Sequence, residues 1–305
     1  MIKIDLITGF LGSGKTTFIK KYAKYLIGKG EKIGILENDF GAVNVDMMLL
    51  QELQGDNCNI ETVAGACDAD CHKRRFKTKL IAMAMSGYDR VIIEPSGIFD
   101  TDEFFDTLRE EPLDRWYESG NVIAIADSRL EEDLSENSEY LLTSQIANAG
   151  TIILSRVQET SPEIVSRTVL HIRKSLENFN RKNSPDNIII KDWNEFSEND
   201  FEKISLCGYV KADFTKRFSA GNYSSVYFMN SKISVDELKQ KADKIFKDKN
   251  CGNVFRIKGF IFENNRWFEI NATEKNISVS DIRNGQEIII IIGENLVKEN
   301  ISKYI

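Results

Sequence analysis

The run Gly9–Thr16 has the residue types and the spacing of a loop that binds phosphate groups. It reads G-x-x-x-x-G-K-[ST] and stands between a short apolar segment and an amphipathic one. Glycines let successive backbone N–H groups curl around a β-phosphate, and the positive end of a following helix adds to the attraction. Lys15 then reaches the β/γ oxygens, and Thr16 offers its hydroxyl to Mg²⁺. We expect the contacts to come from Gly9, Gly12, Ser13, Gly14, Lys15, Thr16 and Thr17.

Phosphoryl transfer at such a P-loop also needs a carboxylate near the metal and a group that positions water. Glu94 ends the apolar run that starts at Arg90, and Gly97 follows closely enough to bring backbone near a γ-phosphate. Asp39 follows a second apolar run and would reach the same carboxyl edge of a sheet, where α/β proteins bind ligands. The alternatives are that Glu94 caps the next helix and that Asp39 forms an ordinary turn. We predict Lys15, Glu94 and Asp39 as catalytic residues, and Thr16, Asp39 and Glu94 as Mg²⁺ ligands.

The segments that must position these residues alternate between strand-like and helix-like patterns. Several strand-like runs are continuously apolar, as expected of strands covered on both faces of a parallel sheet. Between them, residues 16–29 and 162–179 have apolar side chains at helical spacing. The alternation predicts an α/β fold, a doubly wound P-loop NTPase with a mainly parallel sheet. The predicted strands are Ile2–Ile7, Lys32–Leu36, Arg90–Ile93, Asn121–Ala126, Thr151–Leu154 and Asn187–Ile190.

A change of pattern after residue 205 predicts a second, smaller domain of α+β type. At 305 residues the chain exceeds the usual size of a single domain. A helix is expected over Ser234–Phe246, with strands near Ser225–Phe228, Val254–Phe262, Trp267–Asn271 and Glu287–Ile292. We assign 1–205 to the nucleotide-binding domain, 206–224 to a linker and 225–305 to the C-terminal domain.

Composition narrows the classes of partner. The chain is 42% hydrophobic and 29% charged, as in ordinary globular proteins. No stretch approaches the roughly 20 apolar residues that span a bilayer. A formal net charge of −7 opposes attraction to nucleic acid or to an anionic membrane. The five cysteines are unevenly spaced, which argues against a disulfide framework. We expect a cytoplasmic protein that binds neither nucleic acid nor membrane.

With these motifs in this order, the sequence resembles the CobW-type GTPases, relatives of the HypB and UreG proteins that mature nickel enzymes. The resemblance spans most of the chain. It is carried by ITGFLGSGKTT, by ENDFGAVNVD with Asp39 and Asp46, by EPSG at Glu94–Gly97, by the strand that ends in Asp127, by FRIKGFIF at Phe255–Phe262 and by Gly293. It implies hydrolysis of GTP with Mg²⁺, the handling or delivery of zinc or cobalt, and a C-terminal domain of the family's type.

The segment after Thr151–Leu154 departs from this family. Its members usually carry N-K-x-D there, whose acid accepts hydrogen bonds from guanine, whereas this chain reads Ser155-Arg156-Val157-Gln158. The neutral amide of Gln158 cannot offer a carboxylate pair to guanine N1–H and N2–H₂. The stem of Arg156 can cover the base as the family's lysine does. We expect Ser155, Arg156 and Gln158 at the base of GTP, with ATP as the alternative and weaker discrimination between the two than an N-K-x-D protein shows.

A cluster of thiol, carboxylate and imidazole groups lies between the two acidic segments. Cys67, Cys71 and His72 stand within six residues, with two aspartates, where the family usually has C-x-C-C. Thiolates with imidazole suit Zn²⁺, Co²⁺ or a similar ion, and three ligands leave one position open for release. Cys58 would be a fourth ligand. The alternative is a helix N-terminus with a capping aspartate, a solvated His72 and two cysteines packed as small hydrophobic side chains.

Three functions are open on the sequence alone. The first is an NTPase, with GTP as substrate, that couples binding and hydrolysis of the Mg²⁺–nucleotide to the handling of a transition metal. The second is an activator or cofactor-insertion factor that carries no metal itself. The third is a nucleotide-dependent regulator. We expect the partner to be a client metalloprotein or a cofactor-dependent enzyme, and the sequence leaves the oligomeric state open.

Overall fold

The computed structural model describes most of the chain, which divides into two compact units. The described residues are 1–10, 12–38, 49–63, 69–95, 101–130, 134–178, 187–210, 223–274, 276–282 and 285–305. One unit extends over Met1–Arg217 and the other over Phe218–Ile305. Each unit has a hydrophobic core of its own.

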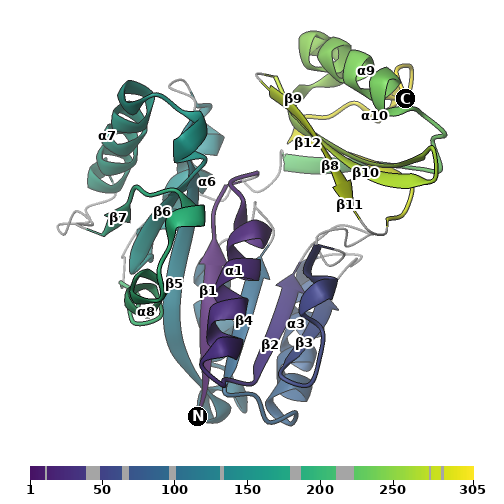
Figure 1. The fold of residues 1–305 in the computed structure, drawn as a ribbon. Coiled ribbons are helices and arrows are strands. Elements are labelled where there is room, and N and C mark those ends of the chain that lie inside the picture. The colour runs from purple at the N-terminus through teal and green to yellow at the C-terminus, as the bar shows by residue number, and fades with distance from the viewer. Residues whose placement is uncertain are drawn as a thin grey trace. The chain divides into compact units, whose positions relative to one another are not determined.

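The first unit is built on a sheet of seven described strands (Figure 1). Their order is β3-β2-β4-β1-β5-β6-β7, so β1 lies at the centre. Every neighbouring pair is parallel, which brings the carboxyl ends of the strands to one edge. The predicted α/β class with a parallel sheet is confirmed. The strands are β1 (Ile2–Thr8), β2 (Ile33–Asn38), β3 (Cys58–Val63), β4 (Arg90–Pro95), β5 (Tyr117–Asp127), β6 (Thr151–Ser155) and β7 (Ile188–Ile189).

Helices cover both faces of this sheet. Phe18 and Tyr22 of α1 belong to the core on one face. Leu80 of α3, Ile146 of α6 and Ile172 of α7 belong to the core on the other. Successive strand residues alternate between these two cores, which explains the continuously apolar runs. The helices are α1 (Lys15–Gly28), α3 (Ala69–Ala84), α4 (Thr101–Leu108), α5 (Leu113–Trp116), α6 (Glu136–Ala147), α7 (Pro162–Asn178) and α8 (Glu198–Ile204), with short 3₁₀ turns η1 (Gln51–Leu53), η2 (Val157–Glu159) and η3 (Trp193–Glu195).

A buried polar network connects α1 with three strands of the sheet. Asp5 of β1 is 0% exposed and accepts hydrogen bonds from Tyr22 Oη at 2.8 Å and Arg90 Nη1 at 2.7 Å. It also accepts from the backbone N and Nδ2 of Asn121, at 2.8 and 3.0 Å. Arg90 Nε in turn donates to Glu31 Oε2 at 2.8 Å. Burial, and then the Asp5 carboxylate, raise the pKa of Tyr22 well above its ordinary value, so this phenol stays protonated and donates.

The second unit is an antiparallel sheet with a helix on one face (Figure 1). The strand order is β11-β10-β9-β12-β8, and every neighbouring pair is antiparallel. α9 starts with a capping box of Ser234 and Glu237 and buries Leu238 and Ile245 in the core. The elements are β8 (Tyr223–Met229), α9 (Val235–Lys247), η4 (Lys249–Cys251), β9 (Asn253–Glu263), β10 (Arg266–Thr273), β11 (Asn276–Ile282), β12 (Ile288–Glu294) and α10 (Lys298–Ile301).

The start of the predicted linker packs against the first unit. The Gly208 carbonyl accepts a hydrogen bond from Val122 N at 2.9 Å, and Val210 N donates to the Asn148 carbonyl at 3.0 Å. A Cβ at Gly150 would lie 2.3 Å from the Gly208 oxygen, so the two segments are in close contact. The first unit therefore extends beyond the predicted boundary at residue 205, and residues 211–222 lie outside the described part of the chain.

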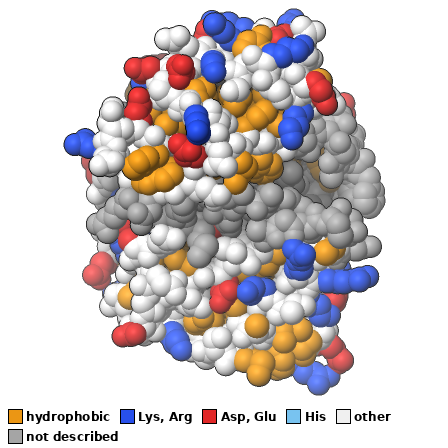
Figure 2. All heavy atoms as spheres, turned by 90° about the vertical axis from the view of Figure 1, so that its right-hand side faces the viewer, with side chains coloured by type: hydrophobic (Ala, Val, Ile, Leu, Met, Phe, Trp, Pro, Cys, Tyr) orange, Lys and Arg blue, Asp and Glu red, His pale blue; other side chains and the backbone are white. Residues whose placement is uncertain are grey.

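The surface mixes charges with apolar side chains. On the face that Figure 2 shows, acidic and basic side chains of the described residues are interspersed, with hydrophobic ones between them. Large apolar side chains that stay exposed include Met85, Leu170 and Leu206. In the described part of the chain, no helix is long and apolar enough to cross a membrane.

Candidate functional site

The P-loop joins β1 to α1, and its first glycine has no room for a side chain. Gly9 has a φ of +146°, and a Cβ there would lie 2.2 Å from the carbonyl oxygen of Ile125 in β5. A larger residue would have to push the loop off the sheet. The first glycine of the motif thus lets the loop lie directly against the carboxyl end of β5. Leu11 lies outside the described residues.

The second half of the loop leads into α1 through left-handed backbone. Gly12 and Gly14 have φ values of +79° and +100°, which glycine adopts without steric cost. Gly14 is the N-cap of α1, so the first N–H groups of the helix face the loop. The buried hydroxyl of Ser13 has no hydrogen-bond partner among the described residues. A bound phosphate would satisfy these donors, so the loop fits the predicted ligand.

Two side chains at the start of α1 connect the helix to the loop and to β4. Lys15 Nζ donates to the carbonyl oxygen of Gly9 at 3.1 Å, which places the ammonium group across the loop. Thr16 Oγ1 donates to Glu94 Oε1 at 2.9 Å, and both side chains are buried. A hydroxyl and a carboxylate in contact are hard oxygen donors, which suit Mg²⁺. The next residue, Thr17, is exposed.

A second buried carboxylate, which the sequence prediction missed, lies beside Glu94. Glu37 of β2 is in register with Glu94 of β4, so the two side chains project from the same face of the sheet. Asn38 ends β2 with 1% exposure, and neither of its amide atoms has a hydrogen-bond partner within the described ranges. The sequence predicted Asp39 rather than Glu37 at this position. Asp39 and Gly97 both lie outside the described residues. Glu37 has the same sequence pattern as Glu94, because each is an acidic residue at the end of an apolar run.

The segment Ser155–Gln158, here termed the base loop, includes the last residue of β6 and the first two residues of η2. Ser155 is buried and in register with Asp127, the last residue of β5. Arg156 Nη2 donates to the carbonyl oxygen of Gly12 at 3.0 Å, and its Nη1 donates to Asp127 Oδ2. Gln158 lies in η2 and is exposed. The structure thus joins Arg156 to the P-loop and leaves Gln158 at the surface.

Trp193, which the sequence analysis did not single out, lies against the end of the P-loop and against β6. Its Nε1 donates to the carbonyl oxygen of Leu154 in β6 at 2.9 Å. Its ring atom Cη2 lies 3.2 Å from the place that a Cβ on Gly14 would take. The ring also packs edge-on against Phe18, with centroids 5.7 Å apart. Trp193 therefore packs against the start of α1 and holds it next to the strand that precedes the base loop.

The predicted metal cluster is described only in part. Cys71 and His72 are successive residues in the first turn of α3, so they do not face one another. His72 is 1% exposed, whereas Cys71 is half-buried. Cys67 lies outside the described residues. Within the ranges that the structure describes, no group of three or more His, Cys, Asp or Glu side chains could hold a metal ion.

Cys58 lies too far from this cluster to be its fourth ligand. It is the first residue of β3, in register with Ile33 at the amino end of β2. α3 follows the carboxyl end of β3, whereas Cys58 lies at the amino end of β3, one strand length away. Burial also raises the pKa of the Cys58 thiol to about 11, which opposes the thiolate form that binds metal. The prediction for Cys58 is therefore wrong.

A comparison with protein families identifies the domain that carries the P-loop. The model of the CobW/HypB/UreG nucleotide-binding domain matches residues 3–185, which include the P-loop, both buried glutamates and the base loop. The chain belongs to this family.

Two curated relatives from Escherichia coli resemble this CobW/HypB/UreG protein over part of their length. The zinc chaperone YeiR is 30% identical over 164 residues, which cover 53% of this chain and 49% of YeiR. The zinc chaperone YjiA is 30% identical over 165 residues, which cover 51% of this chain and 49% of YjiA. The chain thus spans about half the length of the curated relatives it matches. The crystal structure of the hydrogenase maturation factor HypB from Archaeoglobus fulgidus is 19% identical over 67% of this chain and 86% of that one, with a TM-score of 0.42.

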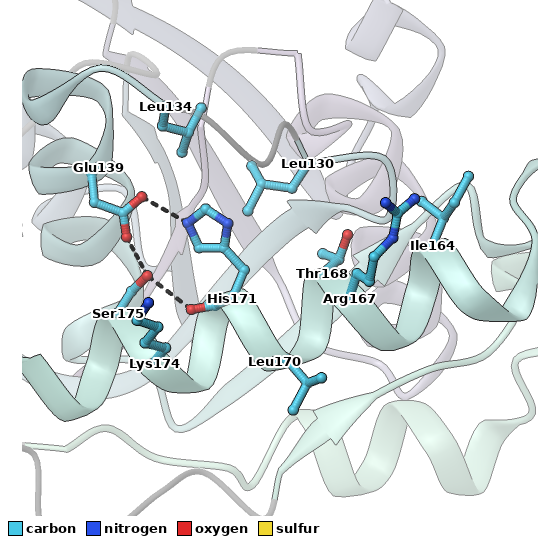
Figure 3. Close-up of a pocket in the computed structure, with 10 residues that line it drawn as sticks. All are labelled: Leu130, Leu134, Glu139, Ile164, Arg167, Thr168, Leu170, His171, Lys174 and Ser175. Atoms are coloured by element: carbon cyan, nitrogen blue, oxygen red, sulfur yellow. Dashed lines mark hydrogen bonds and ion pairs between the residues drawn. The ribbon is translucent and has the colours of Figure 1, made fainter.

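A cavity of about 510 Å³ in this CobW/HypB/UreG protein is lined mainly by residues of α7 (Figure 3). The carboxylate of Glu139 in α6 points one oxygen toward His171 and the other toward Ser175, both of α7. His171 Nε2 is 2.7 Å from Glu139 Oε2, and Ser175 Oγ donates to Glu139 Oε1. Because both side chains reach Glu139 rather than each other, they do not form a serine–histidine nucleophile pair. The three residues join α6 to α7.

Proposed function

We propose that this protein binds and hydrolyses GTP with Mg²⁺ at the P-loop and couples the nucleotide to the handling or delivery of a transition metal such as zinc or cobalt. The observation that carries the proposal is the hydrogen bond from Thr16 to the buried Glu94. It joins the P-loop hydroxyl to a carboxylate on the neighbouring strand, as a Mg²⁺-dependent phosphoryl transfer requires. Family membership supports GTP over ATP, and the names of the zinc chaperone relatives support a metal cargo.

Each residue of the site has a role that follows from its position. The P-loop N–H groups and the start of α1 bind the β-phosphate, while Lys15 neutralises charge at the β/γ oxygens. Thr16 and Glu94 would hold Mg²⁺, with Asp39 as a further ligand, and the bound ion would neutralise charge on the phosphate oxygens. Glu94 would also orient the attacking water, because its carboxylate is paired with the Thr16 hydroxyl that would hold Mg²⁺.

The proposed cargo site is the start of α3. α3 follows β3 at the carboxyl edge of the sheet, so Cys71 lies at the same edge as the P-loop. Cys67 and Cys71 supply thiolates in this proposal, and His72 joins them only if the first turn of α3 rearranges, because successive helical residues do not face one ion. Nucleotide that orders the neighbouring segments would then change metal affinity, and metal would change nucleotide affinity by the same factor.

The burial of His72 favours a second candidate function. In that case the protein is an NTPase that activates a client metalloprotein, or inserts its cofactor, without carrying the ion. A nucleotide-dependent regulator whose slow hydrolysis times its release from the client is a variant of this candidate.

Metal stoichiometry of the nucleotide-loaded protein separates the two candidates. The protein is loaded with GDP or with a non-hydrolysable GTP analogue and titrated with Zn²⁺. We expect about one ion per chain, bound with different affinity in the two states, and less tightly at acid pH because thiolates and neutral imidazole are the ligating forms. Cys67→Ser/Cys71→Ser should abolish binding, whereas Cys207→Ser, a half-buried cysteine outside the cluster, should not.

The outcomes of this titration are distinct. A double variant that binds Zn²⁺ with unchanged affinity and nucleotide dependence refutes the cluster as the site. A wild-type protein that hydrolyses GTP and binds no metal supports the activator function.

A further inference from the structure

The backbone of Arg156 has a conformation that few side chains adopt. Its φ of 57° and ψ of 28° lie in the left-handed region, which favours Gly, Asn and Asp. Its carbonyl oxygen accepts a hydrogen bond from Thr160 Oγ1 at 2.9 Å, and that hydroxyl lies 2.7 Å from Ser128 Oγ in the loop after β5. Unfavourable backbone that is held by its surroundings clusters at functional positions.

The guanidinium group of Arg156 connects two different elements. Nη2 donates to the carbonyl oxygen of Gly12 in the P-loop at 3.0 Å, and Nη1 donates to Asp127 Oδ2 at the end of β5. Asp127 is itself fixed, because its Oδ1 accepts from the backbone N of Arg129 at 2.9 Å and from its Nε at 3.2 Å. Hydrogen bonds between charged groups are about twice as strong as neutral ones. A continuous path of contacts therefore leads from the P-loop through Arg156 to the sheet.

We propose that Asp127 is a positioning residue for Arg156, and that Arg156 ties the P-loop to the base loop so that a nucleotide meets both loops already in place. This inference rests on the proposed function, because it concerns the same nucleotide site. A loop that is ordered in advance costs less to order on binding, so the tie strengthens binding beyond any contact of its own with the nucleotide. Arginine suits this role because its planar fork serves two acceptors at once, whereas lysine is a single point charge.

Arg156→Gly separates this role from a purely structural one, because stability and affinity should respond differently. Glycine adopts positive φ freely, and this relief offsets the loss of the partly exposed ion pair with Asp127, so the urea midpoint should stay close to that of the wild type. The affinity for GDP, measured by calorimetric titration, should fall about tenfold, the equivalent of one hydrogen bond to a charged group. The affinity for inorganic pyrophosphate should fall as well, because Gly12 belongs to the phosphate loop. Lys232→Gly is the matched control: Lys232 is an exposed lysine with a φ of 42° in the second unit, and its replacement should leave both affinities unchanged.

Asp127→Asn tests the positioning half of the proposal. It removes the charge that orients Arg156, so the affinity for GDP should fall to a similar extent. The double variant Asp127→Asn/Arg156→Gly should bind GDP no more weakly than Arg156→Gly alone, because the two residues act along one path. Arg156→Lys keeps the charge but loses the fork, so its affinity should lie between those of the wild type and Arg156→Gly.

Each contrary outcome overturns a stated step. Wild-type affinity for GDP in Arg156→Gly or Asp127→Asn, or additive losses in the double variant, overturns the tie. A loss of GDP affinity with unchanged pyrophosphate affinity overturns it too, because Arg156 would then act on the base alone. A wild-type protein that binds no GDP refutes the proposed function itself, a result distinct from wild-type binding that persists in the variants.

Discussion

Asp5→Asn should destabilise the first unit by about 3 kcal/mol and leave nucleotide affinity unchanged. The new amide would turn an NH₂ group toward Tyr22 Oη and Arg90 Nη1, which now donate to the carboxylate at 2.8 and 2.7 Å. Removing one partner of a buried ion pair costs about 3–5 kcal/mol. The lower end of this free-energy range applies to Asp5→Asn, because Arg90 keeps its ion pair with Glu31. Gly9, four residues further along the chain, lies about 13 Å from Asp5 in an extended strand, so the P-loop should not be affected.

Urea unfolding with a parallel GDP titration measures both quantities. Since small proteins have urea m-values of about 1–3 kcal/mol per M, a loss of 3 kcal/mol lowers the midpoint by at least about 1 M. Glu198→Gln is the control, because its exposed ion pair with Lys29 should be worth less than about 1 kcal/mol. The reasoning fails if Asp5→Asn shifts the midpoint no more than Glu198→Gln does. It also fails if the folded variant binds GDP more weakly than the wild type.

Three further substitutions test the site and the surface. Lys15→Ala should abolish hydrolysis and greatly weaken triphosphate binding, because it removes the ammonium group at the β/γ oxygens, and normal affinity for a GTP analogue would contradict the P-loop assignment. Glu94→Gln should keep most of the binding but slow single-turnover hydrolysis by roughly 100-fold, and an unchanged rate would move the catalytic acid elsewhere. Lys24 and Lys20 lower the pKa of Glu52 to about 2, so its stabilising effect is present above pH 4.5 and is lost as the pH falls toward 2. Glu52→Gln should therefore lose less stability than the wild type between these pH values, and parallel stability curves would argue against the two lysines as the cause.

The P-loop and Glu94 could be predicted because their chemistry is local in the sequence. A glycine-rich turn after an apolar run needs one strand and one helix, and the hydrogen bond from Thr16 to Glu94 confirms that β4 lies beside β1. Asp127 and Trp193 belong to the site through contacts with Arg156 and with the start of α1, respectively. Those contacts depend on the order of strands in the sheet. The residues next to Asp127 and Trp193 in the sequence do not indicate that order.

Edge strands explain most of what the sequence reading missed in the fold. β3 has apolar side chains at alternate positions, Cys58 and Ile60, and pairs only with β2 among the described strands. Continuously apolar runs are typical of strands that are buried on both faces, so an edge strand such as β3 does not show this pattern. α3 shows the helical spacing in Phe76, Leu80 and Met83, which all reach the core, and its start at Ala69 agrees with the helix N-terminus given as the alternative to the metal cluster.

The central position of β1 has a consequence for how the chain is made. β1 and the P-loop leave the ribosome before the strands that flank β1, because β4 and β5 end only at Pro95 and Asp127. At about 5–20 residues per second, synthesis from Thr8 to Asp127 takes on the order of ten seconds. During that time β1 lacks at least one of the strands that flank it in the finished sheet. Synthesis that stops before Asp127 therefore yields a complete P-loop sequence without the complete pair of strands that flank β1.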